Sequence, residues 1–465
     1  MSLGNTAYGK EKIRELLRDI KSIYFLGIGG INMSALARMT VAQGLRAGGY
    51  DRTRSGITEK LEKSGIEVFY ELDPEHLSGY GALVYTVAIS EDNPEYLRAQ
   101  ELQIPVISRA DYMGYIMSGY RERIGISGMH GKSTTTAMVA SVFEYGGADP
   151  TVLSGAELKG IESSYREGGL DNLVFEACEY KDSFLEFYPS VAIVLNIDLD
   201  HLDYFSGIGH IRSSFTKFIN KCRDGGTVVL NFDDADVRAV ASEYKGNLVS
   251  FGVDSGDVDY RAVNIEYCGR KCGFDLLFKN DFFCHIDLSV TGEHYVRDAL
   301  AAAAAAASCG ISKDGIIKGL SSFTGVHRRM EYRGKYFGAD VFDDYAHHPK
   351  EIRSTFSAVE KMGYNNVWCI YQPHTYSRTA TLYDDFISAF SDYKVNVIFS
   401  DIFAARETNK WGVSSEKLAE EIPGAKYYSD HEGIIGFLKS NVKDGDAVIV
   451  MGAGDICSIL EEMKL

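Results

Sequence analysis

The sequence predicts an α/β fold in three domains: a Rossmann-like N-terminal domain, a central P-loop domain with a mostly parallel sheet, and a C-terminal Rossmann-like α/β domain. Two glycine-rich turns, near residues 27–30 and 128–131, each follow a short apolar run and precede helical spacing. Beyond residue 340, apolar strands alternate with helical runs. Because 465 residues exceed what one hydrophobic core usually serves, we expect domains at 1–121, 122–325 and 326–465.

The N-terminal domain begins with a short amphipathic helix over residues 9–20 and an apolar strand, Ser22–Leu26, that ends in Gly27-Ile28-Gly29-Gly30. A helix is expected from about Met33, and Asp51 follows at about the 20-residue spacing that places a carboxylate near a ribose hydroxyl. Met33 and Ser34 occupy the region of the third fingerprint glycine, so another nucleotide-bearing ligand is favoured over a dinucleotide redox cofactor. A tight turn that only packs helix on strand remains the alternative. Further elements are expected in this order: strands at Ile66–Tyr70, Ala82–Val87 and Ile104–Ile107, then a linker at Ser118–Arg123.

The central domain carries the clearest motif, Gly128-x-x-Gly131-Lys132-Ser133, between an apolar strand over 124–127 and a helix that starts near Lys132. Glycines let backbone amides turn around an anion, the helix adds its positive end, and the Lys and Ser side chains can meet terminal phosphates and a magnesium ion. The loop is shortened, because Ile126 stands where the full Walker pattern has glycine. An ordinary glycine-rich turn would explain the glycines but not Lys132 and Ser133.

Two further strands, Asn172–Ala177 and Val191–Asn196, each lead into acidic residues. If these strands neighbour the phosphate loop, their carboxyl ends bring the acids to it. A cation that bridges phosphates needs few, mostly oxygen ligands; Glu176 is the first choice for that role and His201 the second. The remaining acids of this region are Glu179, Asp198, Asp200 and Asp203, and of these we expect Glu179, Asp198 and Asp200 to be solvated loop residues.

The second half of the chain continues with an alternating stretch over 248–290, expected as a small antiparallel patch, and an alanine-rich helix that opens at 292–298. His294, Tyr295 and Asp298 either face a purine or cap this helix. A strand at Asp340–Phe342 leads into His347-His348-Pro349, expected as a turn into a helix at about residue 350 rather than as a metal site. Three more strands, Val367–Tyr371, Val395–Ser400 and Ala447–Met451, are followed by polar loops that suit a small-molecule pocket.

Composition excludes several classes of function. The formal net charge of −17 argues against nucleic-acid or anionic-membrane partners, because no basic cluster offsets it. No apolar run approaches the length of a membrane span. Eight scattered cysteines with no secretory signal ahead of them are expected to be reduced thiols in a cytoplasmic protein.

Taken together, the motifs resemble the Mur ligase family over nearly the whole chain. The GIGG turn and the motifs at 372–379 and 401–407 favour the alanine-adding branch of that family over its later-acting relatives. The motifs that carry the resemblance are GIGGINMS at 27–34, YTVAISEDNPE at 85–95, GMHGKSTTT at 128–136, EACEYKDSF at 176–184, NIDLDHLDYF at 196–205, HRRME at 327–331, DDYAHHP at 343–349, QPHTYSRT at 372–379, DIFAARE at 401–407 and MGAGDI at 451–456.

The resemblance implies an ATP-dependent amide ligase with a UDP-sugar-binding N-terminal domain, a central P-loop ATPase domain and a C-terminal domain that closes over the acceptor amino acid. ATP would phosphorylate the carboxylate of UDP-N-acetylmuramate, and the amine of L-alanine would attack the acyl phosphate; Lys132 and magnesium ions would neutralise the gathered charge.

Residue by residue, the resemblance implies four sets of contacts. ATP would meet Gly128, Met129, His130, Gly131, Lys132, Ser133, Thr134, Tyr295, Asp298, Arg329 and Asp344, and Mg²⁺ would meet Ser133, Glu176 and His201; Lys132, His201, Arg329 and Asp344 would be catalytic. The UDP-sugar would meet Gly27, Gly29, Gly30, Asn32, Met33, Ser34, Asp51, Thr86 and Ala88, and the acceptor would face His347, His374, Arg378 and Arg406.

The sequence departs from the family pattern at a few of these positions. Tyr295 and Asp298 replace the two asparagines of the nucleotide-facing G-x-H-N-x-x-N motif, Asn32 stands where glycine is usual, and Gly48-Gly-Tyr precedes Asp51 where serines are usual. Two alternatives therefore stay open: a recycling ligase that attaches an intact tripeptide to UDP-N-acetylmuramate, and a nucleotide-binding paralogue without turnover. A nicotinamide-dependent dehydrogenase, the reading of the GIGG turn alone, is disfavoured by Lys132.

Overall fold

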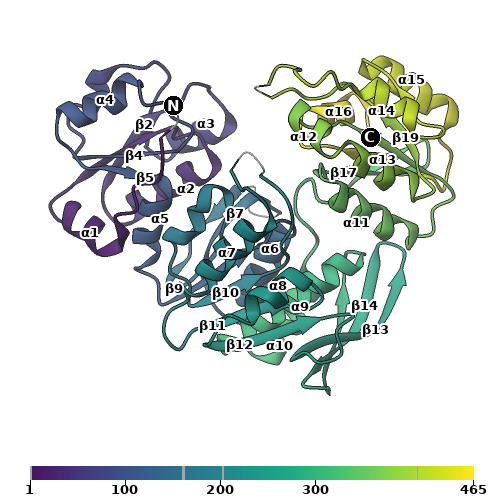
Figure 1. Ribbon diagram of the computed structural model, residues 1–465, viewed down its shortest axis with the longest axis horizontal. Helices are drawn as coiled ribbons and strands as arrows, with labels where there is room; N and C mark the ends of the chain where they lie inside the picture. Colours follow the sequence, from purple (N-terminus) through teal and green to yellow (C-terminus); the bar gives the residue numbers. More distant parts are fainter. Residues whose placement is uncertain (1–2, 160–162, 202–203, 406) are drawn as a thin grey trace. The chain divides into compact units, whose positions relative to one another are not determined.

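The computed structural model describes residues 3–159, 163–201, 204–405 and 407–465 (Figure 1). The chain divides into two compact units. Unit 1 holds the residues up to Arg261 together with Leu276–Cys284 and Asp298–Leu320, and unit 2 holds Ala262–Asp275, His285–Arg297 and Ser321–Leu465. The predicted α/β class with largely parallel sheets is confirmed, while the three predicted domain boundaries stay predictions.

The N-terminal sheet has five parallel strands in the order β3-β2-β1-β4-β5. Its central strand β1 is buried along its whole length, as expected for an apolar strand covered on both faces. The strands are β1 Ser22–Leu26, β2 Arg46–Tyr50, β3 Glu67–Phe69, β4 Ala82–Tyr85 and β5 Val106–Ser108. The helices are α1 Gly9–Leu16, α2 Ile31–Ala42, α3 Gly56–Lys63, η1 Pro74–Leu77, α4 Pro94–Glu101 and α5 Arg109–Met117.

Strand β2 is absent from the sequence prediction, because its Gly48-Gly49 pair reads as a turn. The structure shows why glycine is needed there. A Cβ on Gly49 would lie 2.1 Å from the carbonyl oxygen of Phe25, and one on Gly48 would lie 1.9 Å from the hydroxyl of Tyr80. These glycines allow close packing inside a strand rather than a turn.

The second sheet has ten strands in the order β15-β14-β13-β12-β11-β10-β6-β9-β7-β8. Strand β6 pairs in parallel with β10 on one side and β9 on the other, so the elements that follow these strands meet at one edge. The strands are β6 Glu122–Ser127, β7 Pro150–Leu158, β8 Ser163–Arg166, β9 Gly169–Glu176, β10 Val191–Val194, β11 Thr227–Asn231, β12 Asn247–Gly252, β13 Tyr260–Cys268, β14 Lys271–Phe278 and β15 Asp281–Leu288. The helices are α6 Lys132–Tyr145, η2 Tyr180–Glu186, α7 Ile208–Ile219, α8 Ala235–Ala241, α9 Glu293–Ser308 and α10 Lys313–Ser322.

The predicted antiparallel patch over 248–290 is wrong at its start. Strand β12 pairs in parallel with both β11 and β13 and so continues the parallel sheet. Alternation of apolar and polar residues marks a strand with one covered face but does not fix the direction of its partners.

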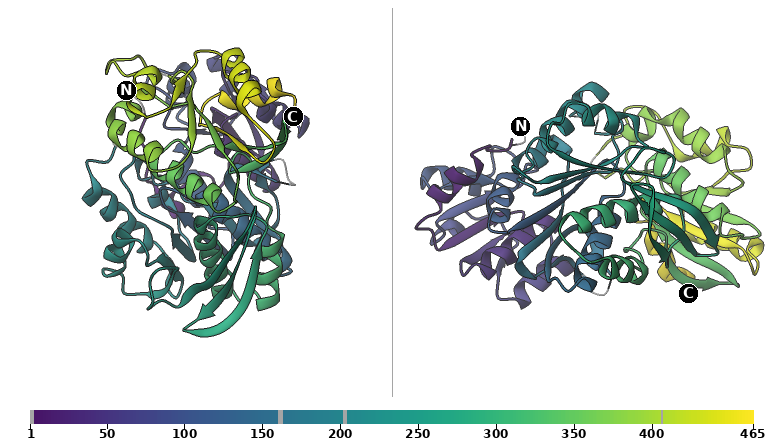
Figure 2. Two further views of the ribbon diagram at one scale, coloured as in Figure 1. Left: turned by 90° about the vertical axis from the view of Figure 1, so that its right-hand side faces the viewer. Right: turned by 90° about the horizontal axis from the view of Figure 1, so that it is seen from below.

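The third sheet lies in unit 2, in the order β16-β17-β21-β18-β19-β20, and all its pairs are parallel except that of β16 with β17. Alternate residues of its strands enter two hydrophobic clusters, one on each face, which the surrounding helices cover (Figures 1 and 2). The strands are β16 Glu331–Tyr336, β17 Ala339–Asp344, β18 Val367–Tyr371, β19 Asn396–Phe399, β20 Lys426–Tyr427 and β21 Ala447–Met451. The helices are α11 Pro349–Glu360, α12 Tyr376–Thr381, α13 Tyr383–Ser391, α14 Ser415–Glu421, α15 His431–Asn441, η3 Ile456–Ser458 and α16 Ile459–Met463.

Among the described residues, none of the helices combines the length and the apolar character that crossing a bilayer requires.

Candidate active site

The predicted phosphate loop joins β6 to α6, and α6 begins at Lys132 as the sequence predicts. Gly128 and Gly131 have φ values of +139° and +85°, which L side chains rarely adopt. Space is limited as well, since a Cβ on Gly131 would lie 2.9 Å from Asp298 Oδ1 and one on Gly128 would lie 3.0 Å from Leu195 Cβ. Both glycines are therefore required by conformation and by packing.

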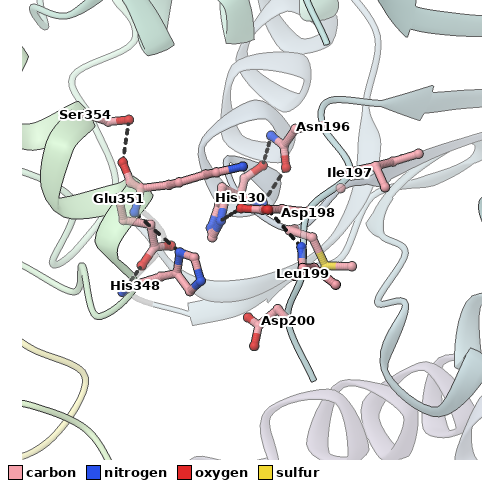
Figure 3. Close-up of polar contacts among 12 residues, drawn as sticks. His130, Asn196, Ile197, Asp198, Leu199, Asp200, His348, Glu351 and Ser354 are labelled. Carbon is pink, nitrogen blue, oxygen red and sulfur yellow. Dashed lines mark hydrogen bonds and ion pairs between the residues drawn. The ribbon is translucent and has the colours of Figure 1, made fainter. Parts of the chain in front are cut away.

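The middle of the loop is held by Asn196, which follows β10. The backbone N–H of His130 donates to Asn196 Oδ1 at 2.9 Å, and Asn196 Nδ2 donates back to the carbonyl of His130 at 3.0 Å (Figure 3). Asp198 lies beside them: it accepts from the N–H of Leu199 at 2.8 Å, and its Oδ2 is 3.8 Å from His130 Nε2. Asp198 is therefore part of the loop's surroundings and not the solvated residue that the sequence suggested.

Lys132 and Glu179 form a buried ion pair. Lys132 Nζ lies 3.1 Å from Glu179 Oε2 and 3.3 Å from Oε1, and it also donates to the carbonyls of Gly128 at 2.5 Å and Met129 at 3.2 Å. Only 1% of the Glu179 side chain is exposed. Burial opposes both charges, but the attraction between them raises the pKa of Lys132 and lowers the pKa of Glu179 overall. The prediction of a solvated Glu179 is therefore wrong, because the chain turns back under the loop after β9.

His201 and Glu176 approach the same lysine from two further segments. His201 Nε2 is 3.4 Å from Glu179 Oε1, so His201, Glu179 and Lys132 form one chain of polar contacts. Glu176 ends β9, and its Oε1 accepts from the N–H of Gly155 at 2.5 Å and from Ser154 Oγ at 3.2 Å. Burial acts to lower the pKa of Lys132, whereas Glu179, Cys178 and, less strongly, Glu176 act to raise it. Ser133 and Thr134 lie buried in the first turn of α6.

Asp298 packs against the phosphate loop. Its Oδ1 accepts a hydrogen bond from Thr135 Oγ1 at 3.0 Å, and the side chain is 6% exposed. Together with the short approach to Gly131, this contact makes Asp298 a support for the loop and for α6.

At the N-terminal glycine turn, the structure assigns Asp51 a definite partner. The N–H of Gly29 donates to Asp51 Oδ2 at 2.9 Å, and the N–H groups of Gly27 and Ile28 donate to the carbonyl of Tyr50. A Cβ on Gly29 would lie 2.7 Å from that same Oδ2. Asp51 thus holds the turn, in addition to any contact with a ribose.

The other predicted UDP-sugar residues differ in exposure. Gly30 and Asn32 are exposed at the start of α2, and Ala88 is exposed beyond β4. Met33 belongs to the hydrophobic core, and Ser34 Oγ donates to the carbonyl of Ile31 at 2.8 Å. Thr86 lies against Gly27, whose added Cβ would be 3.1 Å from Thr86 Cγ2.

In unit 2, Asp344 ends β17 and is almost fully buried. It accepts from the N–H of Ala346 at 2.8 Å and from Thr355 Oγ1 at 2.9 Å, and burial raises the pKa of its carboxyl to about 6. Arg329 Nη1 lies 3.7 Å from Glu351 Oε1. Tyr295 is buried, and its hydroxyl donates to the carbonyl of Arg329 at 3.0 Å, so Tyr295 fixes the backbone of the arginine.

The predicted acceptor-side residues gather in unit 2. The rings of His347 and His374 are 6.0 Å apart, and Arg378 Nη1 lies 3.4 Å from His374 Nδ1. Burial lowers the pKa of both histidines, that of His347 to about 4. His348 caps α11, whose first turn donates to its ring through Lys350 N, while the N–H of His348 donates to Glu351 (Figure 3). The predicted turn into a helix is confirmed there.

Two predicted residues, Asp203 and Arg406, lie outside the described residues. The sequence analysis missed Asn196, which holds the loop, and it named Glu179 without predicting its pairing with the lysine. The available signal for Asn196 was an amide directly after a buried strand, and for Glu179 it was a carboxylate close behind Glu176.

Comparison with known proteins finds three matches along the chain: Mur ligase family, catalytic domain, at residues 22–121; Mur ligase middle domain at 126–306; and Mur ligase, glutamate ligase domain, at 328–454. The UDP-N-acetylmuramate–L-alanine ligase of Clostridium acetobutylicum is 42% identical over 452 residues, which cover 96% of this chain and 98% of that relative. The ligase of the same name from Acetivibrio thermocellus is 42% identical over 446 residues, 95% of each chain.

Solved structures agree with these matches. The UDP-N-acetylmuramate-alanine ligase of Thermotoga maritima has a TM-score of 0.79 at 26% identity and covers 95% of this chain and 98% of its own. A murein peptide ligase from Psychrobacter arcticus has a TM-score of 0.69 at 23% identity over 96% of this chain and 98% of its own, and shows the shared fold.

Proposed function

Because the chain belongs to the Mur ligase family, we propose that it catalyses the ATP-dependent joining of L-alanine to the lactyl carboxylate of UDP-N-acetylmuramate, a step of peptidoglycan precursor synthesis. The observation that carries the proposal is the 42% identity to alanine-adding ligases over 96% of the chain. The reaction forms an acyl phosphate and ADP; attack by the amine then expels phosphate and leaves the amide.

The phosphate loop supplies the charge that the first step requires. The γ-phosphoryl group and the substrate carboxylate are both anionic, so their approach needs cationic groups already in place. Lys132 is such a group, and it is held at the loop by Gly128, Met129 and Glu179. A bound triphosphate would compete with Glu179 for this ammonium, since both are anions within the reach of one flexible side chain.

A magnesium ion fits the residues predicted to hold it. Among the described residues, neither Ser133 Oγ nor Glu176 Oε2 has a hydrogen-bond partner, and both are oxygens of the kind that a hard cation prefers. Ser133 and Glu176 would hold one Mg²⁺ ion, and His201 would hold a second. When bound, the two ions would neutralise phosphate charge beside Lys132.

The acceptor would lie against the group formed by His347, His374 and Arg378 in unit 2. Two neutral imidazoles are suited to the neighbourhood of an amine that must lose protons, and Arg378 offers a partner for the carboxylate of an amino acid. Arg329 and Asp344 remain the residues proposed to reach the nucleotide from this unit.

Phosphate release tests the proposal. The purified protein is incubated with ATP, Mg²⁺ and UDP-N-acetylmuramate, and L-alanine, glycine, L-serine and the tripeptide are added in separate reactions. We expect release with L-alanine above the other acceptors. Release with the tripeptide alone would identify a recycling ligase instead, and ATP binding without release for any acceptor would identify a regulatory protein.

A further inference from the structure

Arg109 is the first residue of α5 and directly follows β5, whose last residue Ser108 caps the helix by accepting from the N–H of Asp111 at 3.4 Å. In the five-stranded sheet, β5 neighbours β4, and β4 neighbours β1. The carboxyl ends of these parallel strands share one edge, so Arg109 stands at the same edge as the Gly27–Gly30 turn and Thr86. Two strand spacings separate the ends of β1 and β5, which is about 10 Å.

Helix α5 packs against η2 and the residues after it, a segment that follows Glu176 and Glu179 in the chain. A Cβ on Gly114 would lie only 2.1 Å from the carbonyl oxygen of Glu186, at the end of η2, so the two backbones touch. The N–H of Tyr188 lies 3.3 Å from Met117 Sδ in the same contact. Arg109 therefore occupies a defined position relative to Cys178 and Glu179, which precede η2.

The charge of Arg109 acts on Cys178, the residue directly before Glu179. The side chain as a whole is intermediate in exposure, but burial of the guanidinium lowers the pKa of Arg109, and Cys178 acts in the opposite direction. Burial and Glu179 raise the pKa of the Cys178 thiol, while Lys132 and Arg109 both act to lower it. Two cations from different segments, Lys132 and Arg109, thus act electrostatically on one thiol.

Arg109 has no hydrogen bond or ion pair to any part of the chain that the structure describes. Arg123, another arginine of intermediate exposure in unit 1, does have such partners, because its Nε donates to the carbonyl of Tyr188 at 2.6 Å and its Nη1 to that of Tyr120 at 2.7 Å. A guanidinium that makes no hydrogen bond within the protein can offer its planar set of N–H donors to an anionic ligand.

We propose that Arg109 binds the carboxylate of the sugar substrate and holds it on the side of Lys132. This inference rests on the proposed function. With the diphosphate at the Gly27–Gly30 turn at the end of β1, the lactyl group is the far, acidic end of the nucleotide sugar, and Arg109 stands about 10 Å along the same edge. The planar fork of a guanidinium matches a carboxylate through two parallel hydrogen bonds. The γ-phosphate of ATP is the other anion within reach, and the experiment separates the two.

The test compares the binding of three ligands to the full-length protein and to Arg109→Gln by titration calorimetry. UDP-N-acetylmuramate carries the lactyl carboxylate, UDP-N-acetylglucosamine lacks it, and ATP with Mg²⁺ carries the γ-phosphate. We expect Arg109→Gln to weaken binding of UDP-N-acetylmuramate about ten- to hundredfold and to leave the other two ligands within about twofold of wild type. Arg18→Gln, at an exposed arginine of the same domain, is the matched control and should change none of them.

Other outcomes overturn the assignment. Equal weakening of both UDP sugars would place Arg109 at their shared part, weakening of ATP alone would make it a phosphate ligand, and unchanged binding of all three would remove it from the site. If Arg109→Gln does not fold, Arg109→Lys keeps the charge but loses the fork, and it should weaken the acid selectively by a smaller factor. The proposed function itself would be refuted if the wild-type protein neither binds UDP-N-acetylmuramate more tightly than UDP-N-acetylglucosamine nor converts UDP-N-acetylmuramate to product. If Arg109→Gln keeps the wild-type preference for UDP-N-acetylmuramate, only the role of Arg109 is refuted.

Discussion

Replacing Glu179 by glutamine tests the buried pair at the phosphate loop. At the observed 3.1 Å and an effective dielectric constant of about 20, the attraction between Lys132 and Glu179 is about 5 kcal/mol. The amide keeps one hydrogen-bond acceptor but leaves the ammonium without its buried counter-charge, so we expect Glu179→Gln to lower the free energy of unfolding of unit 1 by about 2–4 kcal/mol. A bound nucleotide offers Lys132 a second anionic partner, and the loss should be smaller in its presence.

The assay is urea unfolding, followed by intrinsic fluorescence, of wild type and Glu179→Gln with and without saturating ADP and Mg²⁺. The control is Glu157→Gln, because Glu157 is about half exposed and its ion pair with Lys60 spans 3.8 Å, so its removal should change stability by less than about 1 kcal/mol.

Folding lowers the pKa of Glu179, so the ion pair stabilises the folded protein at pH values above the ordinary glutamate pKa of 4.5. This contribution is lost as the pH falls through the lowered pKa. A Glu179→Gln variant as stable as wild type at pH 7, or equally destabilised with and without ADP, would refute the competition between Glu179 and the phosphates.

Three further predictions concern Lys132, Asp344 and Gly131. Lys132→Ala should abolish phosphate release in the ligase assay while leaving calorimetric binding of the UDP-sugar unchanged, because the predicted sugar site lies on another sheet; parallel loss of both would contradict this layout. Burial raises the pKa of Asp344 from 3.8 to about 6, so the contribution of Asp344 to the free energy of unfolding falls by up to about 3 kcal/mol as the pH rises from about 4 to above 6. Asp344→Asn should remove this pH dependence, measured by urea unfolding at pH 4.5 and 7.5, and should impair turnover. Gly131→Ala should destabilise by about 1–3 kcal/mol and raise KM for ATP, whereas Gly44→Ala, with a similar φ of +83° and open space around it, should show only the smaller backbone cost and normal KM.

Much of the fold could be predicted because its strands are short apolar runs that end in glycine or polar residues. Strands β1, β18 and β21 have the predicted boundaries, and α6 begins at the predicted lysine. The errors fall where local pattern and tertiary packing disagree. Strand β2 contains two glycines that its neighbours require, and β12, which lies at the start of the stretch predicted to be antiparallel, pairs in parallel on both sides.

The candidate site was predictable where a motif is contiguous in sequence and unpredictable where the partner comes from another segment. The phosphate loop from Gly128 to Ser133 can be predicted from its own contiguous residues. The contact of Asn196 with His130 depends on β10 lying next to β6, which no local pattern encodes. The exposure of Glu179 was misjudged for the same reason, since its burial arises from the turn after β9 and from Lys132.

Tyr295 and Asp298, which replace the two asparagines of the family's nucleotide-facing motif, show that a position in a motif does not by itself fix what a side chain contacts. Judged by the family pattern, both were expected at the nucleotide, and their side chains now have other partners: Tyr295 fixes the backbone of Arg329, and Asp298 accepts from Thr135 beside Gly131. An asparagine at 298 could accept the same hydrogen bond from Thr135, so this support does not require the carboxylate charge. The charge does matter for a triphosphate, because a buried anion against the loop opposes the binding of another. Asp298→Asn should therefore bind ATP more tightly than wild type with unchanged stability, and weaker ATP binding by this variant would show that the carboxylate itself serves the nucleotide.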